Sequence, residues 1–138
     1  MIRLIGERST DRMDVLLDTH AVIFLLTAPE LLSPQVRNLL STPQEAVFVS
    51  AASVYEIELK RRRGKLPAAL PSQFVEDLEQ GGYKFLPITQ QVARTAAALP
   101  EPNRDPWDRI LIAQALTEDL TFVTRDKVFA QYGVRTIW

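Results

Sequence analysis

The chain has 138 residues, of which 46% are apolar and 24% are charged, and its formal net charge is −1. This length and composition predict one globular domain and exclude a disordered or repetitive chain. A net charge near zero excludes a global positive field that would attract nucleic acid, so RNA or DNA would have to meet a local basic patch or bound metal ions. The absence of cysteine excludes disulfides and thiolate zinc sites.

Residues 1–13 are predicted to form a polar, loosely ordered leader, and residues 14–138 a single domain. The leader lacks the long apolar core of a signal peptide. The longest apolar run, Ala21 to Leu26, is too short to span a bilayer. We therefore expect a soluble, cytoplasmic protein with no membrane contact.

Short runs that are apolar on both faces alternate with helical patterns along the rest of the chain. Runs of this kind are typical of strands buried within a parallel sheet. In chain order, the predicted elements are strand Val15–Asp18, helices Thr19–Leu26 and Ser33–Leu40, strand Ala46–Val49, helices Ser50–Arg63 and Pro71–Gln80, strand Tyr83–Pro87, helices Thr89–Leu99 and Pro106–Glu118, strand Thr121–Thr124, a helical turn at Lys127–Gln131 and strand Val134–Trp138. The alternation predicts an α/β sandwich with right-handed crossovers around a mainly parallel sheet.

Several carboxylates stand where these apolar segments begin or end. They are Asp18, Glu56, Asp105, Asp108 and Asp126. Acidic side chains are rarely buried unless they are paired or bound to metal, so this recurrence predicts one folded acidic cluster. Asp18 and Asp126 follow the carboxyl ends of predicted strands, where such sheets bind their ligands. A carboxylate cluster favours hard divalent cations, Mg²⁺ or Mn²⁺, which commonly serve in phosphodiester hydrolysis.

Three of these acids also have a structural interpretation. Asp18 could cap the helix that follows the first strand, and Asp126 could cap the last short helix. Glu56 could form a salt bridge on the surface, although the neighbouring Glu58 is better placed for that role. Taken singly, these alternatives stay open; their joint occurrence favours a shared cation site.

The sequence Asp105-Pro106-Trp107-Asp108 is typical of a helix start. Asp105 is predicted to be the N-cap, Pro106 the first helical residue, and Asp108 an acid in the first turn that favours the helix dipole. The helix that follows is apolar on most faces, so its first turn must lie near the core. An unpaired Asp108 would be costly there.

One basic run and one histidine complete the candidates. Lys60 to Lys65 holds four consecutive cations and Gly64. Cations in a last helical turn complement the helix dipole, with Gly64 as a left-handed cap, and a role in contacting phosphate is equally open. His20, the only histidine, is predicted to serve in packing or hydrogen bonding rather than as a base.

In combination these segments resemble PIN-domain ribonucleases, specifically the toxins of VapBC toxin–antitoxin pairs. The matching segments are Leu16–His20, Ser53–Ile57 with Lys60 and Gly64–Leu66, Asp105–Ala115, and Val123–Asp126 with Phe129. Tyr55 stands where the subgroup usually has Trp, and Asn103 where relatives often carry His.

The resemblance implies a PIN-like three-layer α/β/α sandwich and an endoribonuclease that depends on Mg²⁺ or Mn²⁺. It also implies a growth-inhibiting toxin that forms a homodimer and is neutralised by a cognate VapB-like antitoxin. By position, the catalytic, metal-binding quartet is Asp18, Glu56, Asp108 and Asp126. Asp105 is an additional acid, either a metal ligand or only a cap, and Thr124 matches a hydroxyl residue that lines the pocket.

Two other functions remain compatible with the residues. The acid cluster could be structural, in a non-catalytic regulatory or assembly module with a PIN fold. The protein could also be a metal-dependent DNA nuclease, because the hydrolytic chemistry does not itself require a 2′-hydroxyl.

Overall fold

The computed structural model describes residues 13–42, 46–67, 69–100, 103 and 105–138, so residues 1–12 of the predicted leader lie outside the described part. The strands are β1 Val15–Leu17, β2 Val47–Ser50, β3 Lys84–Leu86, β4 Thr121–Val123 and β5 Thr136–Ile137. The α-helices are α1 Thr19–Thr27, α2 Pro34–Leu40, α3 Ala51–Arg62, α4 Phe74–Gln80, α5 Gln90–Ala98 and α6 Pro106–Thr117. Two 3-10 helices, η1 Pro29–Leu31 and η2 Lys127–Tyr132, complete the described elements.

The strands form one sheet in the order β3-β2-β1-β4-β5, and every pair is parallel. The chain adds β2 and β3 on one side of β1, then returns to add β4 and β5 on the other. Strand order therefore reverses between β1 and β4, where Leu17 lies opposite Val123. In open α/β sheets, ligands bind at such a reversal, beyond the carboxyl ends of the strands.

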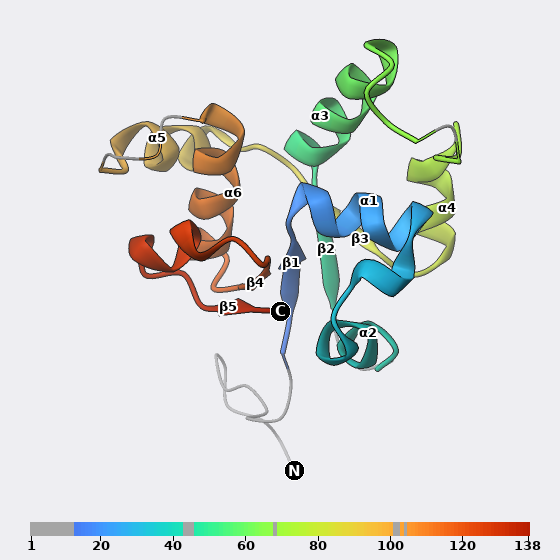
Figure 1. Ribbon diagram of the computed structural model, residues 1–138. Coiled ribbons are helices and arrows are strands. Elements are labelled where there is room, and N and C mark those ends of the chain that lie inside the picture. Colours follow the sequence, from blue (N-terminus) through green and yellow to red (C-terminus); the bar gives the residue numbers. More distant parts are fainter. Residues whose placement is uncertain (1–12, 43–45, 68, 101–102, 104) are drawn as a thin grey trace.

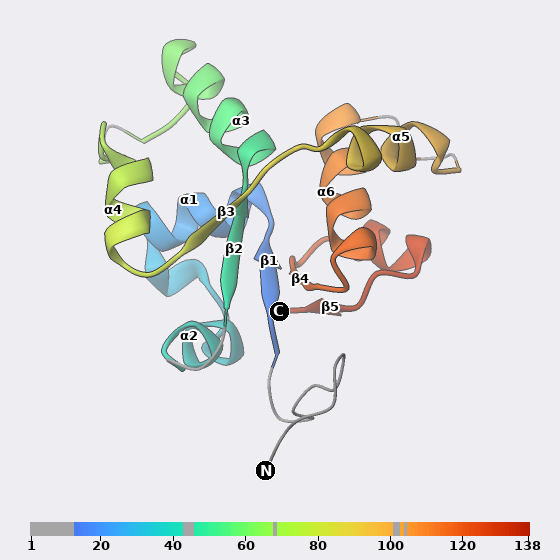
Figure 2. The ribbon, with the colours of Figure 1, turned by 180° about the vertical axis from the view of Figure 1, so that it is seen from behind.

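Helices cover both faces of the sheet, as the alternating side chains of β1 require. Val15 and Leu17 belong to a core shared with α1 to α4, whereas Leu16 packs with residues of α6 and η2 on the opposite face. Figure 1 shows α1 to α4 on one side of β1 and β2 and α5 and α6 on the other. From behind, Figure 2 shows α5 lying along the outside of α6. The predicted three-layer α/β/α sandwich with a parallel sheet is confirmed.

One local prediction was wrong, and one short turn was not predicted. Helix α4 begins at Phe74, not at Pro71. The Arg61 guanidinium donates to the backbone carbonyls of Leu70 and Pro71, at 3.3 and 2.9 Å. A helix that began at Pro71 would use these carbonyls to accept its own backbone N–H groups. The turn η1 was not predicted; Pro29 starts it, and the backbone N–H of Leu32 closes it on the Pro29 carbonyl.

Helix α3 ends as predicted. Gly64 has a φ of +66°, which is the left-handed conformation that favours glycine. The backbone N–H groups of Gly64 and Lys65 donate to the carbonyls of Arg61 and Lys60 and close the last turn. Across the described ranges, no helix is long and apolar enough to cross a membrane.

Candidate active site

The acids singled out in the sequence line one pocket of about 560 Å³. Asp18 follows β1, Glu56 lies on α3, Asp105 and Asp108 open α6, and Asp126 follows β4. The pocket therefore lies at the carboxyl ends of β1 and β4, where strand order reverses. Its other lining residues are Thr19, His20, Ala21, Phe24, Lys60, Arg125, Phe129 and Trp138.

Asp18 is buried, with 7% of its surface exposed, and its carboxylate does not cap α1. Asp18 does occupy the N-cap position of α1, as the cap interpretation predicted, but its side chain makes no capping hydrogen bond. Instead, Asp18 Oδ2 accepts a hydrogen bond of 2.8 Å from the Thr124 hydroxyl. The Thr124 oxygen also accepts the backbone N–H of Asp126, at 3.1 Å, so it links the two acids. Burial raises the pKa of Asp18; the Thr124 hydrogen bond and the positive charge of His20 oppose the rise, and Glu56 adds to it.

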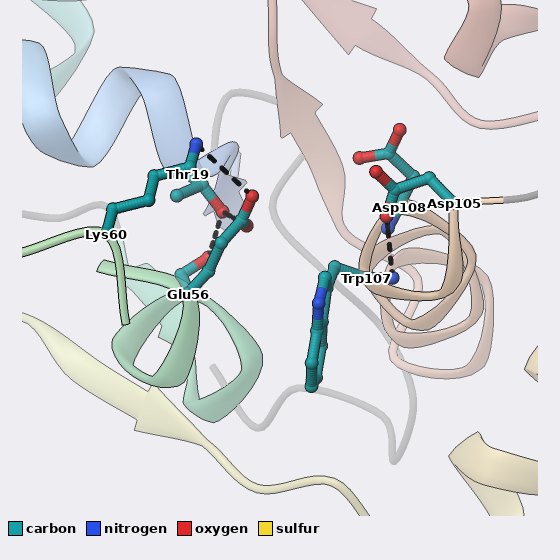
Figure 3. Close-up of polar contacts among 7 residues, drawn as sticks. Thr19, Glu56, Lys60, Asp105, Trp107 and Asp108 are labelled. Atoms are coloured by element: carbon teal, nitrogen blue, oxygen red, sulfur yellow. Dashed lines mark hydrogen bonds and ion pairs between the residues drawn. The ribbon is translucent and has the colours of Figure 1, made fainter. Parts of the chain in front are cut away.

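Glu56 is held by a chain of hydroxyl groups (Figure 3). The Thr19 hydroxyl donates to Glu56 Oε1 at 2.9 Å. Ser53 Oγ lies 2.8 Å from the Thr19 oxygen, and because the Thr19 proton is committed to Glu56, Ser53 is the donor. Lys60 Nζ lies 3.5 Å from Glu56 Oε2, one turn along α3. Thr19 and Ser53 are buried, and the sequence did not predict that they hold a site residue.

The neighbouring Glu58 has the surface role predicted for it. It is exposed and pairs with Arg61 at 3.0 Å. Glu56 points the other way, into the pocket, although it too has a lysine partner. The structure therefore confirms the prediction that Glu58, rather than Glu56, forms the salt bridge on the surface.

The two acids at the start of α6 differ in environment. Asp105 is exposed and caps the helix, with Oδ1 accepting the backbone N–H groups of Trp107 and Asp108 at 2.9 and 3.2 Å. Asp108 is half-buried and accepts a 3.3 Å hydrogen bond from the Asn103 amide. Burial is the main cause that raises the pKa of Asp108 to about 6, with the charges of Asp105, Asp18 and Glu56 adding to it.

Asn103 and Arg109 order the approach to α6. The Asn103 side-chain oxygen accepts the backbone N–H of Asp105 at 3.0 Å, while its amide holds Asp108. Arg109 stabilises the segment between α5 and α6. Its guanidinium donates to the backbone carbonyls of Ala96, Leu99, Pro100 and Asn103. Asn103 thus contacts both acids. The sequence did not predict this role, because it indicated only that Asn103 stands where relatives often carry His.

The last acid, Asp126, caps a helix and also lines the pocket. Its Oδ1 accepts the backbone N–H of Val128 at 3.0 Å and so caps η2. It is also exposed along the pocket wall. His20, in the first turn of α1, is exposed and also lines the pocket.

The donor set fits a divalent cation in kind. Carboxylate oxygens are the ligands that Mg²⁺ and Mn²⁺ prefer. Burial is the main cause that raises the pKa values of Asp18 and Asp108, and neighbouring carboxylates add to both shifts. Within the described residues, however, no group of three acidic or histidine side chains is close enough to hold one ion. Coordination by three of these side chains at once would therefore require them to move toward one another.

An aromatic contact joins the two helices that carry Glu56 and Asp108. The rings of Tyr55 on α3 and Trp107 on α6 lie with centroids 4.9 Å apart and planes tilted by 36°. Tyr55 and Trp107 directly precede Glu56 and Asp108 in sequence. The contact therefore fixes the separation of α3 and α6 next to the acids that they present.

Comparison with known proteins agrees with this geometry. The family model of the PIN domain matches residues 15–134. No curated protein sequence matches the chain. Among solved structures, VapBC2 from Rickettsia felis, bound to a DNA fragment from its promoter, has a TM-score of 0.67 and 14% identity, with 91% of this chain and 98% of that chain covered.

Two further complexes have the same fold. FitAcB from Neisseria gonorrhoeae is 25% identical, with a TM-score of 0.58 and coverage of 90% of this chain and 96% of that one. DNA-bound VapBC from Salmonella typhimurium is 20% identical, with a TM-score of 0.62 and coverage of 91% and 97%. The fold and family predicted from the sequence motifs are confirmed.

Proposed function

Because the chain belongs to the PIN domain family, we propose that it is an endoribonuclease dependent on Mg²⁺ or Mn²⁺ and acts as a VapC-like toxin. The observation that carries the proposal is the convergence of Asp18, Glu56, Asp105, Asp108 and Asp126, from four separate segments, on one pocket. The similarity of the fold to toxins of VapBC complexes supports the toxin assignment. The site residues proposed are the quartet Asp18, Glu56, Asp108 and Asp126, with Asp105 as a further ligand or only a cap.

A divalent cation held by these carboxylates would supply a water of lowered pKa and would stabilise the charge that develops on the phosphate. The chain's own residues orient the ligands: Thr124 holds Asp18, Thr19 holds Glu56, and Asn103 holds Asp108. In hydrolysis, the oxygen of this water would bond to phosphorus, and a carboxylate of the cluster would accept the water proton. The bond from phosphorus to the 3′ oxygen would break and that oxygen would take a proton from solvent, so the product would carry a 5′-phosphate.

The test is cleavage of a total RNA pool by the purified protein with Mg²⁺ or Mn²⁺, with and without EDTA. Asp108→Asn provides the inactive variant, and Glu58→Gln, which removes an exposed carboxylate outside the pocket, provides the matched control. Single-stranded DNA in parallel distinguishes a DNA nuclease. Calorimetric titration with Mn²⁺ distinguishes a non-catalytic module, which would bind no cation.

A cognate VapB-like antitoxin is proposed as the protein partner. An apolar groove of about 450 Å³ shares His20, Phe24 and Lys60 with the acidic pocket, and Leu31 in its lining is 53% exposed. Because the groove and the pocket share these lining residues, one arm of a partner could fill the groove with apolar anchors and place an Arg or Lys among the carboxylates.

A homodimer is proposed for the free toxin. Helices α1 and α2 leave several apolar side chains only half-buried: Phe24, Leu25, Leu26, Leu39 and Leu40. Covering such a surface with a second copy removes it from water. Light scattering at tens of micromolar should report a dimer, and a monomer at this rough concentration would contradict the proposal.

A further inference from the structure

An RNA strand that enters the acidic pocket must bring its phosphates close to several carboxylates. The chain as a whole gives no compensating positive field, because its formal net charge is −1. The positive side chains that line the described pocket are Lys60 and Arg125, beside His20. Within the lining of this pocket, Lys60 and Arg125 are therefore the side chains that can offer a positive charge to a phosphate.

Lys60 and Arg125 are not equally available. Lys60 Nζ lies 3.5 Å from Glu56 Oε2, so its charge is already shared with a member of the acid cluster. Arg125 is exposed, and within the described part of the chain it forms no ion pair. Its charge is the one that remains free to meet a phosphate at the pocket wall.

The Arg125 guanidinium is also held in place. Its central carbon lies 5.2 Å from the centroid of the Phe24 ring, a cation–π contact. The Phe24 ring in turn meets Trp138 edge-on, with centroids 6.4 Å apart and an interplanar angle of 64°. All three residues line the pocket. Stacking uses the face of the guanidinium and leaves the N–H groups at its edge free to donate.

We propose that Arg125, stacked on Phe24, binds a phosphate of the RNA strand at the wall of the acidic pocket and so raises the affinity of the protein for the strand. The inference rests on the proposed ribonuclease function and adds a substrate-binding residue outside the acid quartet. The planar guanidinium can give two parallel hydrogen bonds to one phosphate, which a lysine cannot reproduce. A phosphate contact carries no base information, so it acts on every RNA sequence alike.

The test compares steady-state cleavage of a labelled single-stranded RNA by the wild type, Arg125→Gln, Arg125→Lys and Arg94→Gln, at several potassium chloride concentrations with Mg²⁺. Arg94 is an exposed arginine on α5 that does not line the pocket, and it provides the matched control. Arg125→Gln should raise KM about tenfold, as expected for one charge-assisted contact. The turnover number should stay within about twofold, because uniform binding was removed.

Salt dependence separates a phosphate contact from a merely structural role. Loss of one contact to a single strand should lower the slope of log KM against log salt by about 0.7. Arg125→Lys should keep most of the slope with a smaller rise in KM, and Arg94→Gln should match the wild type in both.

Each other result overturns the inference in a recognisable way. An active wild type with unchanged KM and slope in Arg125→Gln would refute the role of Arg125 and leave the ribonuclease assignment intact. Unchanged RNA kinetics with weaker binding of a purified antitoxin would assign Arg125 to the protein partner instead. A wild type that cleaves no RNA with either metal would refute the ribonuclease function, and this inference with it.

Discussion

Asp18 is a carboxylate that the fold buries beside other carboxylates. Its replacement by Asn removes one negative charge from the pocket and keeps an oxygen that can accept the Thr124 hydroxyl proton. Asp18→Asn should therefore abolish metal-dependent cleavage and stabilise the metal-free protein, by an amount on the order of 1 kcal/mol, or about 4 °C in Tm.

Thermal melting in EDTA and RNA cleavage measure the two effects separately. Glu58→Gln is the control, because its exposed pair with Arg61 should contribute little to stability and nothing to cleavage. Cleavage at the wild-type rate by purified Asp18→Asn would show that Asp18 has been assigned wrongly.

The two acids at the start of α6 should respond differently to truncation. Asp108→Ala should remove activity, because this side chain lies half-buried in the pocket. Asp105→Ala should mainly weaken helix initiation, by about 1 kcal/mol, since it removes the acceptor for two backbone N–H groups. Urea unfolding with activity measured on the same samples tests both. A fully stable and inactive Asp105→Ala protein would identify Asp105 as a metal ligand.

The raised pKa of Asp108 predicts an unusual dependence of stability on pH. Its pKa is about 6 in the folded protein against an ordinary value of 3.8. The folded state therefore binds more protons than the unfolded state between these values, so the contribution of this group to stability falls as pH rises through the window. In EDTA, acidification from about pH 7.5 to about pH 5 should raise the Tm of the wild type relative to Asp108→Asn. Parallel melting curves for the two proteins would contradict it.

At the scale of elements, Arg109 connects helix α6 to the segment that leads into it. Its guanidinium donates to several carbonyls of that segment, which an ammonium group cannot reach together. Arg109→Lys should destabilise the protein by about 2 kcal/mol and lower cleavage, because Asn103 would no longer be held against Asp108. Arg94→Lys on α5 is the control, and urea unfolding with RNA cleavage is the measurement. Wild-type stability and activity in Arg109→Lys would refute this role.

The elements were largely predictable because buried strands and helices leave a clear periodic pattern. Within the part of the chain that the structure describes, the five strands and six α-helices lie where the sequence patterns predicted them, within a few residues. The start of α4 and the turn η1 were not predictable in the same way. Arg61 on α3 sets the first through a contact across the fold, and no periodic pattern marks a 3-10 turn as short as Pro29–Leu31.

The acids of the candidate site could be predicted from the sequence, but the hydrogen bonds that hold them could not. Position at the ends of core segments selected Asp18, Glu56 and Asp108. Their hydrogen-bond partners Thr19, Ser53 and Asn103 carry no such signal, since a hydroxyl or amide is equally common on the surface. Only the packing of α1, α3 and α6 brings these groups together.

For the whole molecule, the antitoxin arm and the metal should compete. A guanidinium placed among the carboxylates replaces the charge of a cation, so antitoxin binding should weaken as Mg²⁺ rises. Exposed charge pairing alone is weak, and the apolar groove that includes Leu31 should supply most of the affinity.

Titration of an antitoxin arm against the wild type and a variant with Asp18→Asn and Asp108→Asn provides the measurement. The double variant should bind less tightly and should lose its response to Mg²⁺. Equal affinity for the two proteins, together with no effect of Mg²⁺, would show that inhibition does not operate through the acidic pocket.

The pairing of β1 with β4 also has a consequence for synthesis of the protein. The hydrogen bond between Asp18 and Thr124 joins residues 106 positions apart. A ribosome completes β1 early but releases β4 and Asp126 only after nearly all of the domain has been translated. The nascent chain therefore lacks the complete pocket until nearly all of the domain has left the ribosome, so a nuclease activity of the kind proposed would be absent during most of its own synthesis.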